Sequence, residues 1–188
     1  MSRRPLRTTL LTLLATSSLA LAACGGEHGP TTEAHTEGLY LDLETLDYQV
    51  QISRVLNPAV PPDRSYVSGL PDFVSDPGDD ETWFGVFLRV QNQTDQPALA
   101  TTDIHIVDTT GREYRPIRLD PDANPFAYTG GEVAPHSVVP DPDSAAGFSS
   151  AQGKLLLFKL TYQSLGNRPL ELVLEGADGT EATVDLDI

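Results

Sequence analysis

Apolar and polar residues alternate along much of the chain from Leu39 onward, which is the pattern of half-buried β-strands. In the first clear example, Leu46, Tyr48, Val50 and Ile52 alternate with polar neighbours. Successive side chains of a strand point to opposite faces of its sheet. This strand is therefore expected to have one buried and one solvated face.

A second strand is expected over residues 82–92, and its first half is apolar on both sides. Phe84 and Val86 lie on one face, whereas Trp83 and Phe87 lie on the other. A strand that is covered on both faces belongs in the middle of a sheet.

A third pattern combines an alternating strand with a turn. Ile104 and Ile106 begin the strand, which ends at the turn 108–111, where a glycine suits a positive backbone torsion. Tyr114 and Ile117 are expected to continue the return strand.

The C-terminal residues predict a buried strand followed by a closing hairpin. Residues 155–162 form an almost continuous apolar run. Leucines at alternate positions of 170–174 are then mirrored by apolar residues of 182–188 across the turn 176–179. The outer face of this hairpin is expected to carry five acids, Glu171, Glu175, Glu181, Asp185 and Asp187.

Two proline-rich stretches, residues 56–81 and 118–150, interrupt these strands. Proline fixes φ and removes a ladder donor, so both are expected to be long loops. Asp143 or Ser144 is expected to cap a short helical turn over 145–147. Seven or eight strands, few helical patterns and no long repeat predict an all-β fold, an immunoglobulin-like antiparallel β-sandwich with two long proline-rich loops. The cysteine pair of antibody domains is absent.

The N-terminal segment has the layout of a secretory signal. Arg3, Arg4 and Arg7 precede a mostly apolar run over residues 10–23. That run is shorter than the roughly 20 residues that a spanning helix needs. Ser2, Arg3 and Arg4 also match a twin-arginine signal in part, so general secretion and twin-arginine export both stay open.

The run Leu21, Ala22, Ala23 and Cys24 resembles the lipobox of bacterial lipoproteins. The resemblance implies cleavage between Ala23 and Cys24 and a diacylglyceryl group on the Cys24 sulfur. Two or three acyl chains such as palmitate on one cysteine hold a protein at a bilayer, whereas one chain binds reversibly. The alternative is a conventional cleavage site after Ala20-x-Ala22, which would leave Cys24 as an exposed thiol with no second cysteine to pair with.

The expected domain organisation has three parts. Residues 1–23 are a lipoprotein signal peptide, residues 24–37 are a lipidated N-terminus with a flexible linker, and residues 38–188 are the sandwich domain. His28 and His35 lie in the expected linker, where no fixed geometry would let them hold a metal.

Charge narrows the range of partners. The chain has 27 acidic and 12 basic residues, and cleavage after residue 23 would remove three arginines and no acid, leaving 12 − 3 = 9 bases and a net charge of −18. This excess argues against nucleic acid and against direct adhesion to anionic lipid headgroups, which both need clusters of lysine and arginine.

No catalytic motif is present in the sequence. A nucleophile elbow, a zinc-protease helix, a phosphate-binding glycine loop and a dinucleotide fingerprint are all absent. We therefore expect no enzyme activity, no catalytic residue, no cofactor and no metal site. The expected function is that of a lipid-anchored protein on the extracytoplasmic face of the cell membrane, which binds a protein or an envelope polymer.

Two alternatives use the acidic residues of the proline-rich stretches. They could be the working pair of a cell-wall hydrolase, or they could offer oxygen ligands to calcium or another metal. The acids in question are Asp76, Asp79, Asp80, Glu81, Asp120, Asp122, Asp141 and Asp143. None has the spacing of a calcium loop, and turn formation explains acids beside prolines equally well.

Histidines and loop aromatics complete the candidate residues. His105 is expected on the solvated face of its strand, and His136 follows a proline in a loop, so neither has an evident partner. Four aromatic residues of the proline-rich stretches could bind a ligand, but packing of the loops onto the sheets is the favoured interpretation. These four residues are Tyr66, Phe73, Phe126 and Tyr128.

Three segments together resemble a known domain. They are residues 83–92, the turn with Asp108, Gly111 and Tyr114, and residues 153–160. The pattern is similar to the telokin-like, immunoglobulin-related domain of bacterial secreted lipoproteins, many of them actinobacterial and functionally uncharacterised. The resemblance implies a fold and an envelope location and supplies no catalytic residues.

Replacing Cys24 with serine tests the predicted anchor. Oxygen at this position cannot accept the diacylglyceryl group, so Cys24→Ser is expected to lose palmitate labelling and to leave the membrane fraction. Fractionation of cells that produce the wild-type and variant chains measures the loss. Equal membrane retention of the two chains contradicts the prediction.

Overall fold

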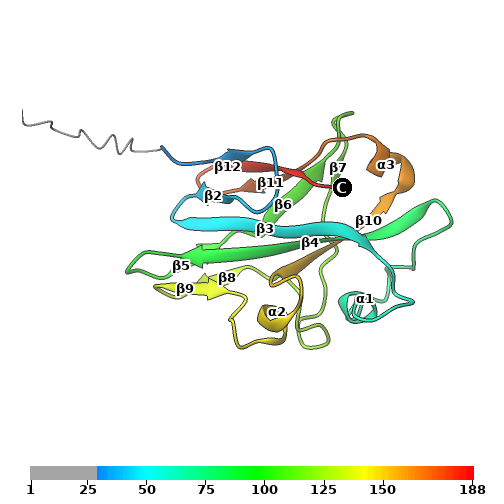
Figure 1. Cartoon of the computed structure of the whole chain (residues 1–188), viewed down its shortest axis with the longest axis horizontal. Coiled ribbons are helices and arrows are strands. Elements are labelled where there is room, and N and C mark those ends of the chain that lie inside the picture. Colours follow the sequence, from blue (N-terminus) through cyan, green and yellow to red (C-terminus); the bar gives the residue numbers. More distant parts are fainter. Residues whose placement is uncertain (1–28) are drawn as a thin grey trace, which may run out of the picture.

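The computed structural model describes residues 29–188, so the predicted signal peptide, its predicted cleavage site, Cys24 and His28 lie outside the described residues. Strands dominate, and two sheets pack face to face (Figure 1). The predicted all-β sandwich is confirmed. None of the helices within residues 29–188 has the length and apolar character needed to cross a membrane.

Sheet A has five strands, in the order β1 (Glu33–Ala34), β12 (Glu181–Leu186), β11 (Leu170–Glu175), β6 (Asp103–Val107) and β7 (Glu113–Tyr114). Sheet B has the order β10 (Lys154–Thr161), β4 (Glu81–Asn92), β3 (Leu46–Leu56) and β2 (Tyr40–Leu43), with β9 (Ser137–Val139) also paired to β4. A separate pair is formed by β5 (Ala98–Ala100) and β8 (Gly131–Val133). The helices are α1 (Asp63–Tyr66), α2 (Ala145–Phe148) and α3 (Tyr162–Gly166).

The main core lies between the two sheets and follows from the period-two alternation of their strands. Leu172 of β11 pairs with Val184 of β12 on one side and with Ile106 of β6 on the other, and all three side chains are buried. The predicted closing hairpin is confirmed, with acids on its outer face: Glu171 lies opposite Asp185, and Glu175 lies opposite Glu181.

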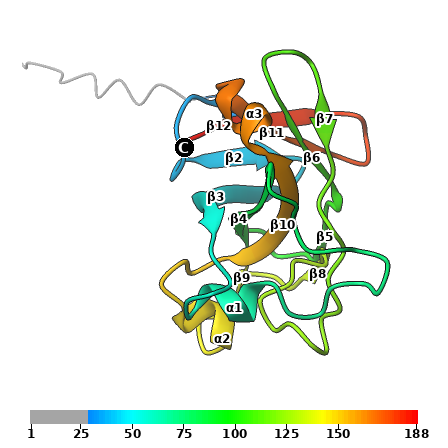
Figure 2. The ribbon, with the colours of Figure 1, turned by 90° about the vertical axis from the view of Figure 1, so that its right-hand side faces the viewer.

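Strand β4 contributes to a second core on the other face of sheet B. Phe84 and Val86 belong to the main core, whereas Trp83 and Phe87 pack beneath the proline-rich loops. In both views α1 and α2 lie on the side of sheet B that faces away from sheet A (Figure 2). The expected central strand is confirmed, and the loops form a third layer over it.

The predicted alternation fails at Ile52, which was expected on the buried face. A β-bulge between Val50 and Ile52 shifts the register of β3 against β4. Ile52 is therefore 39% exposed, whereas Ser53 is buried. One extra residue in a strand reverses the face on which every later side chain lies.

Buried aromatic and amide groups fasten the two proline-rich loops to each other. The Tyr66 ring meets the Phe87 and Phe126 rings edge-on, with centroids 4.9 Å and 4.8 Å away. Asn124 is fully buried, and its amide nitrogen donates to the carbonyl oxygens of Tyr66 and Ser68 at 3.0 Å each. The predicted packing is confirmed for these aromatics.

Phe73 does not follow this pattern, because it is 88% exposed.

The predicted helical cap is confirmed: the Ser144 side chain accepts from the Gly147 amide at the start of α2.

The expected linker is wrong for the part that the structure describes. Thr31 exchanges main-chain and side-chain hydrogen bonds with Asp42 beside β2, and β1 pairs in parallel with β12. These bonds involve backbone groups, which a pattern of small polar side chains does not reveal. His35 is 79% exposed and lies 3.1 Å from an Asp185 carboxylate oxygen.

The turn that carries the telokin-like resemblance is built on a buried carboxylate. Asp108 accepts from the amides of Thr110 and Arg112 and from the hydroxyl of Tyr114, and Gly111 takes a φ of 79°. The Thr110 hydroxyl and the Asn167 side-chain amide also donate to this carboxylate. Together with the Arg112 and Thr110 main-chain amides, they hold the pKa of Asp108 well below its usual range. Aspartate, glycine and tyrosine at this spacing therefore have a structural role.

An ion pair fixes the first proline-rich loop. Both Arg54 nitrogens Nη1 and Nη2 donate to Asp63, which is 5% exposed and also accepts from the Asn57 amide at 2.8 Å. The Arg54 hydrogen bonds lower the pKa of Asp63.

Asp63→Asn is expected to lower the free energy of unfolding at pH 7 by about 1.5–3 kcal/mol, the range for hydrogen bonds to charged groups. Because the folded pKa is depressed, the contribution is complete above the unfolded value near pH 4 and is lost as the pH falls through the folded pKa. Urea unfolding at pH 7 and at pH 2–3 measures the difference, which should shrink in acid. Asp95→Asn, at a carboxylate that is 91% exposed, is the control and should change little.

Candidate functional site

A cavity of about 450 Å³ opens at the side of the sandwich, where β6 and the segment after β7 face β10. The residues that line it come from both sheets and from the second proline-rich loop. They are Thr102, Ile104, Arg115, Pro116, Ile117, Arg118, Leu119, Pro121, Tyr128, Thr129, Leu155 and Leu156. We call this cavity the edge pocket.

The floor of the edge pocket is apolar. Ile104 of β6 and Leu156 of β10 come from different sheets, belong to the same core and are almost completely buried. Concave sites with apolar walls and a few polar groups are the usual form of ligand sites in proteins.

Main-chain hydrogen bonds along the free edge of β10 hold the wall of the pocket in place. The Ile117 amide donates to the Leu157 carbonyl at 2.7 Å, and the Tyr128 amide donates to the Leu155 carbonyl at 2.9 Å. These contacts also cover an edge strand that would otherwise expose unpaired backbone groups.

Two tyrosine hydroxyls, from the buried Tyr48 and the partly buried Tyr128, position the start of β6. The Thr101 amide donates to the Tyr48 hydroxyl at 2.8 Å, and the Tyr128 hydroxyl donates to the Thr101 carbonyl at 2.8 Å. Burial raises the pKa of Tyr48 to about 12 and that of Tyr128 well above its ordinary value. Both phenols therefore remain neutral at physiological pH.

The rim of the edge pocket is basic. Arg115 and Arg118 are exposed at its mouth, although only nine basic residues occur after residue 23. Arg115 is paired with Asp103. Within residues 29–188, Arg118 makes neither a hydrogen bond nor an ion pair.

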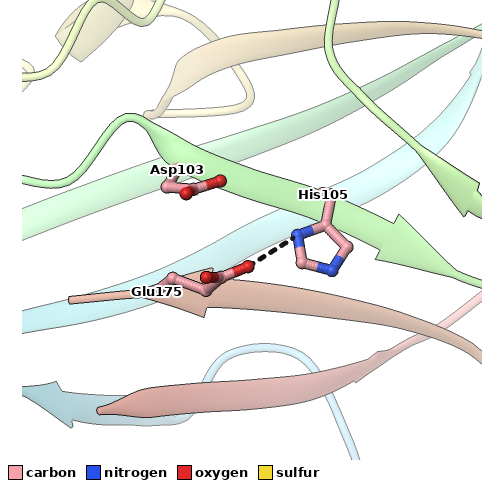
Figure 3. Close-up of side chains that lie close together, drawn as sticks. All are labelled: Asp103, His105 and Glu175. Carbon is pink, nitrogen blue, oxygen red and sulfur yellow. Dashed lines mark ion pairs between the residues drawn. The ribbon is translucent and has the colours of Figure 1, made fainter. Parts of the chain in front are cut away.

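Beside this rim, Asp103, His105 and Glu175 gather on the outer face of sheet A (Figure 3). The expectation of a solvated His105 is wrong. The residue does lie on the face opposite Ile104 and Ile106, but only 6% of it is exposed. It lies directly across from Val173 of β11, on the strand next to the short edge strand β7. The position of a strand within its sheet is not readable from alternation alone.

Two of the acids that the sequence suggested as metal ligands, both in the second proline-rich loop, stabilise local turns instead. The Asp120 carboxylate accepts from the Asp122 amide at 3.0 Å, and the Asp141 carboxylate accepts from the Asp143 amide at 2.8 Å. Of the residues that the structure describes, only Asp103, His105 and Glu175 form a group of three possible metal ligands.

Two further candidates take other positions. Asp76 and Glu81 line a separate open cleft of about 530 Å³ beside Tyr162. His136 pairs with Asp95 at 2.7 Å on the surface, so the expected absence of a partner for His136 is wrong.

No protein-family model matches the chain, and no functionally curated protein matches it. Among solved structures, the yjhA protein of Bacillus subtilis is similar, with a TM-score of 0.48 and 11% identity over 81% of this chain and 99% of that one. An uncharacterised β-sandwich protein of Clostridium difficile 630 has a TM-score of 0.43 and 11% identity, and covers 86% of this chain and 97% of its own.

The ycdA protein of Bacillus subtilis, which its name proposes as a lipoprotein, has a TM-score of 0.45 and 12% identity over 79% of this chain and 38% of that one. The β-sandwich assignment itself rests on the strand pairing described above. The narrower resemblance to the telokin-like domain stays a prediction.

Tyr128→Phe is expected to lower the free energy of unfolding by about 1–2 kcal/mol, because the Thr101 carbonyl loses its partly buried hydrogen-bond donor. Urea unfolding at pH 7 measures this change. Tyr40→Phe is the matched control, since Tyr40 is 41% exposed. Equal stability of the two variants contradicts the positioning role of Tyr128.

Proposed function

We propose that this protein is a lipid-anchored extracytoplasmic binding protein without catalytic activity, whose edge pocket receives part of a protein or an envelope polymer. The observation that carries the proposal is the edge pocket itself, with its apolar floor and basic rim. The group that best fits it combines an apolar body with a negative charge. Burial of the apolar body would provide most of the affinity, and the arginines would select the anion.

Electrostatics supports an anionic group at this position. The whole chain carries a net charge of −15, so most of its surface repels anions. Arg118 makes no ion pair in the described part of the chain, and its guanidinium can form two parallel hydrogen bonds with a carboxylate or a phosphate.

The anchoring part of the proposal rests on the lipobox-like run and on the attachment of Thr31 to the domain. From Cys24 to Thr31 there are 31 − 24 = 7 residue steps. An extended chain covers at most about 3.5 Å per residue, so the domain would lie within roughly 25 Å of the bilayer. A ligand at the envelope surface is within reach of a domain held this close.

Site-specific photo-crosslinking in intact cells tests the binding role. A crosslinker at Thr129, which lines the edge pocket, is expected to capture a specific partner. Arg118→Glu should reduce the captured product at least about fivefold, because it replaces an attractive charge with a repulsive one.

A crosslinker at Leu99 is the control, because Leu99 is 72% exposed and does not line the edge pocket. Capture that is equal at Thr129 and Leu99, or that Arg118→Glu leaves unchanged, contradicts the proposed site.

A further inference from the structure

We propose that Asp103, His105 and Glu175 form a site for a divalent transition-metal ion of the zinc class. The first observation is the state of the imidazole. The His105 side chain is 8% exposed, and its Nδ1 has no hydrogen-bond partner among the described residues. The nearest acidic atom is a Glu175 carboxylate oxygen at 3.5 Å, and Nδ1 points toward it (Figure 3).

The backbone brings the three side chains to one place. Asp103 and Glu175 are direct partners across the antiparallel pair β6 and β11. His105 follows Asp103 by two residues and so lies on the same face. One ligand atom from each of the three residues can be chosen so that all lie within 4.8 Å of one another.

These separations suit a small ion after a modest adjustment. Two ligand atoms on a tetrahedral zinc lie about 3.3 Å apart, given zinc–ligand distances of about 2.0–2.1 Å. The distance between His105 and Glu175 is close to this value. Asp103 is 52% exposed, so its carboxylate has the freedom to close the remaining distance.

Hydrogen bonds of Thr101 hold β6 and β11 in register next to these three residues. The Thr101 hydroxyl donates to the Glu175 main-chain carbonyl at 2.5 Å and accepts from the Asp103 amide at 3.1 Å. The hydroxyls of Tyr48 and Tyr128 bind the Thr101 backbone and fix this residue in turn. When neighbouring hydrogen bonds already hold the ligand residues in place, less conformational entropy is lost as a metal ion binds.

The donor set selects the class of ion. One imidazole with two carboxylates suits zinc and its neighbours among the transition metals. Calcium needs six to eight oxygen ligands, which this group does not offer. The site also differs from the acidic positions in the proline-rich loops that the sequence suggested for calcium.

Arg115 would compete with a metal ion for the Asp103 carboxylate. Its guanidinium pairs with Asp103 and lies 3.9 Å from Glu113. A bound cation would have to share the Asp103 carboxylate with this positive charge. Removal of the arginine charge should therefore strengthen metal binding, whereas a purely structural ion pair would give no such gain.

Two other histidines serve as matched controls. His35 directs Nδ1 at Asp185 and Nε2 at Glu33, so its two acids lie at different ring nitrogens and cannot share one ion with it. His136 has a single acidic partner, Asp95.

Titration calorimetry of the full chain with zinc chloride tests the site, with Cys24→Ser in every sample so that no thiol competes. One saturable zinc per chain is expected. Glu175→Gln and His105→Gln should each lower the association constant at least about tenfold, and Arg115→Gln should raise it about threefold. His35→Gln and His136→Gln should leave it within about twofold. Thermal unfolding without zinc checks that each variant is folded.

Absence of saturable uptake at micromolar zinc overturns the proposal, and so does an association constant that Glu175→Gln leaves unchanged. Glu175 is 36% exposed in its side chain, and its glutamine variant keeps a similar shape, so this variant remains decisive if His105→Gln does not fold. The results for His105→Gln and Glu175→Gln are independent of the edge pocket, because neither residue lines it.

Discussion

Burial of β4 on both faces is the constraint on which the rest of the structure depends. One face of the strand packs against sheet A, and the other packs beneath the proline-rich loops. Gly85 makes this possible at the centre, since a Cβ there would lie 3.0 Å from methyl groups of Leu56 and Leu155. Without a side chain at position 85, both leucines close over the strand. The loops are thus part of the folded core, and one of them forms a wall of the edge pocket.

Charge divides the surface near β6 into two regions. The outer face of sheet A places like charges opposite each other, and burial together with the Asp185 carboxylate raises the pKa of Glu171. Like charges in direct cross-strand positions are destabilising, so this face gains from any cation that approaches it. Arg115 lies beside this acidic face, where it pairs with Asp103, and it also belongs to the rim of the edge pocket. Arg115 therefore pairs with an acid of the face that favours cations and also lines the pocket that favours anions.

The sequence predicted those parts of the fold that depend on local alternation. The closing hairpin, the central position of β4 and the cap at Ser144 all follow from side-chain patterns within a few residues. The exposure of Ile52 could not be predicted, because a bulge leaves no mark in the pattern of apolar residues. The attachment of Thr31 was missed for a related reason, since backbone hydrogen bonds carried by polar residues resemble a linker in the sequence.

The candidate sites were missed because they depend on which strands become neighbours. Alternation places Asp103 and His105 on the same face, and the hairpin pattern places Glu175 on an outer face. Only the pairing of β6 with β11 joins them, over a separation of 175 − 103 = 72 residues. The edge pocket likewise needs Ile104 and Leu156 from different sheets. Clusters of acids in loops resemble metal or catalytic sites in a sequence, yet the carboxylates of Asp120 and Asp141 accept hydrogen bonds within their own turns.

The strand order of sheet A also fixes how the sites lie relative to β1, the first strand of the described residues. The order is β1, β12, β11, β6 and β7, so β1 and β7 form opposite edges. Neighbouring strands lie about 4.8 Å apart, which separates these edges by roughly 19 Å. The chain enters along β1, whereas the edge pocket opens beside β6 and the segment after β7. A lipid anchor at the N-terminus, as proposed above, would therefore hold the domain at the edge of the sheet opposite the pocket.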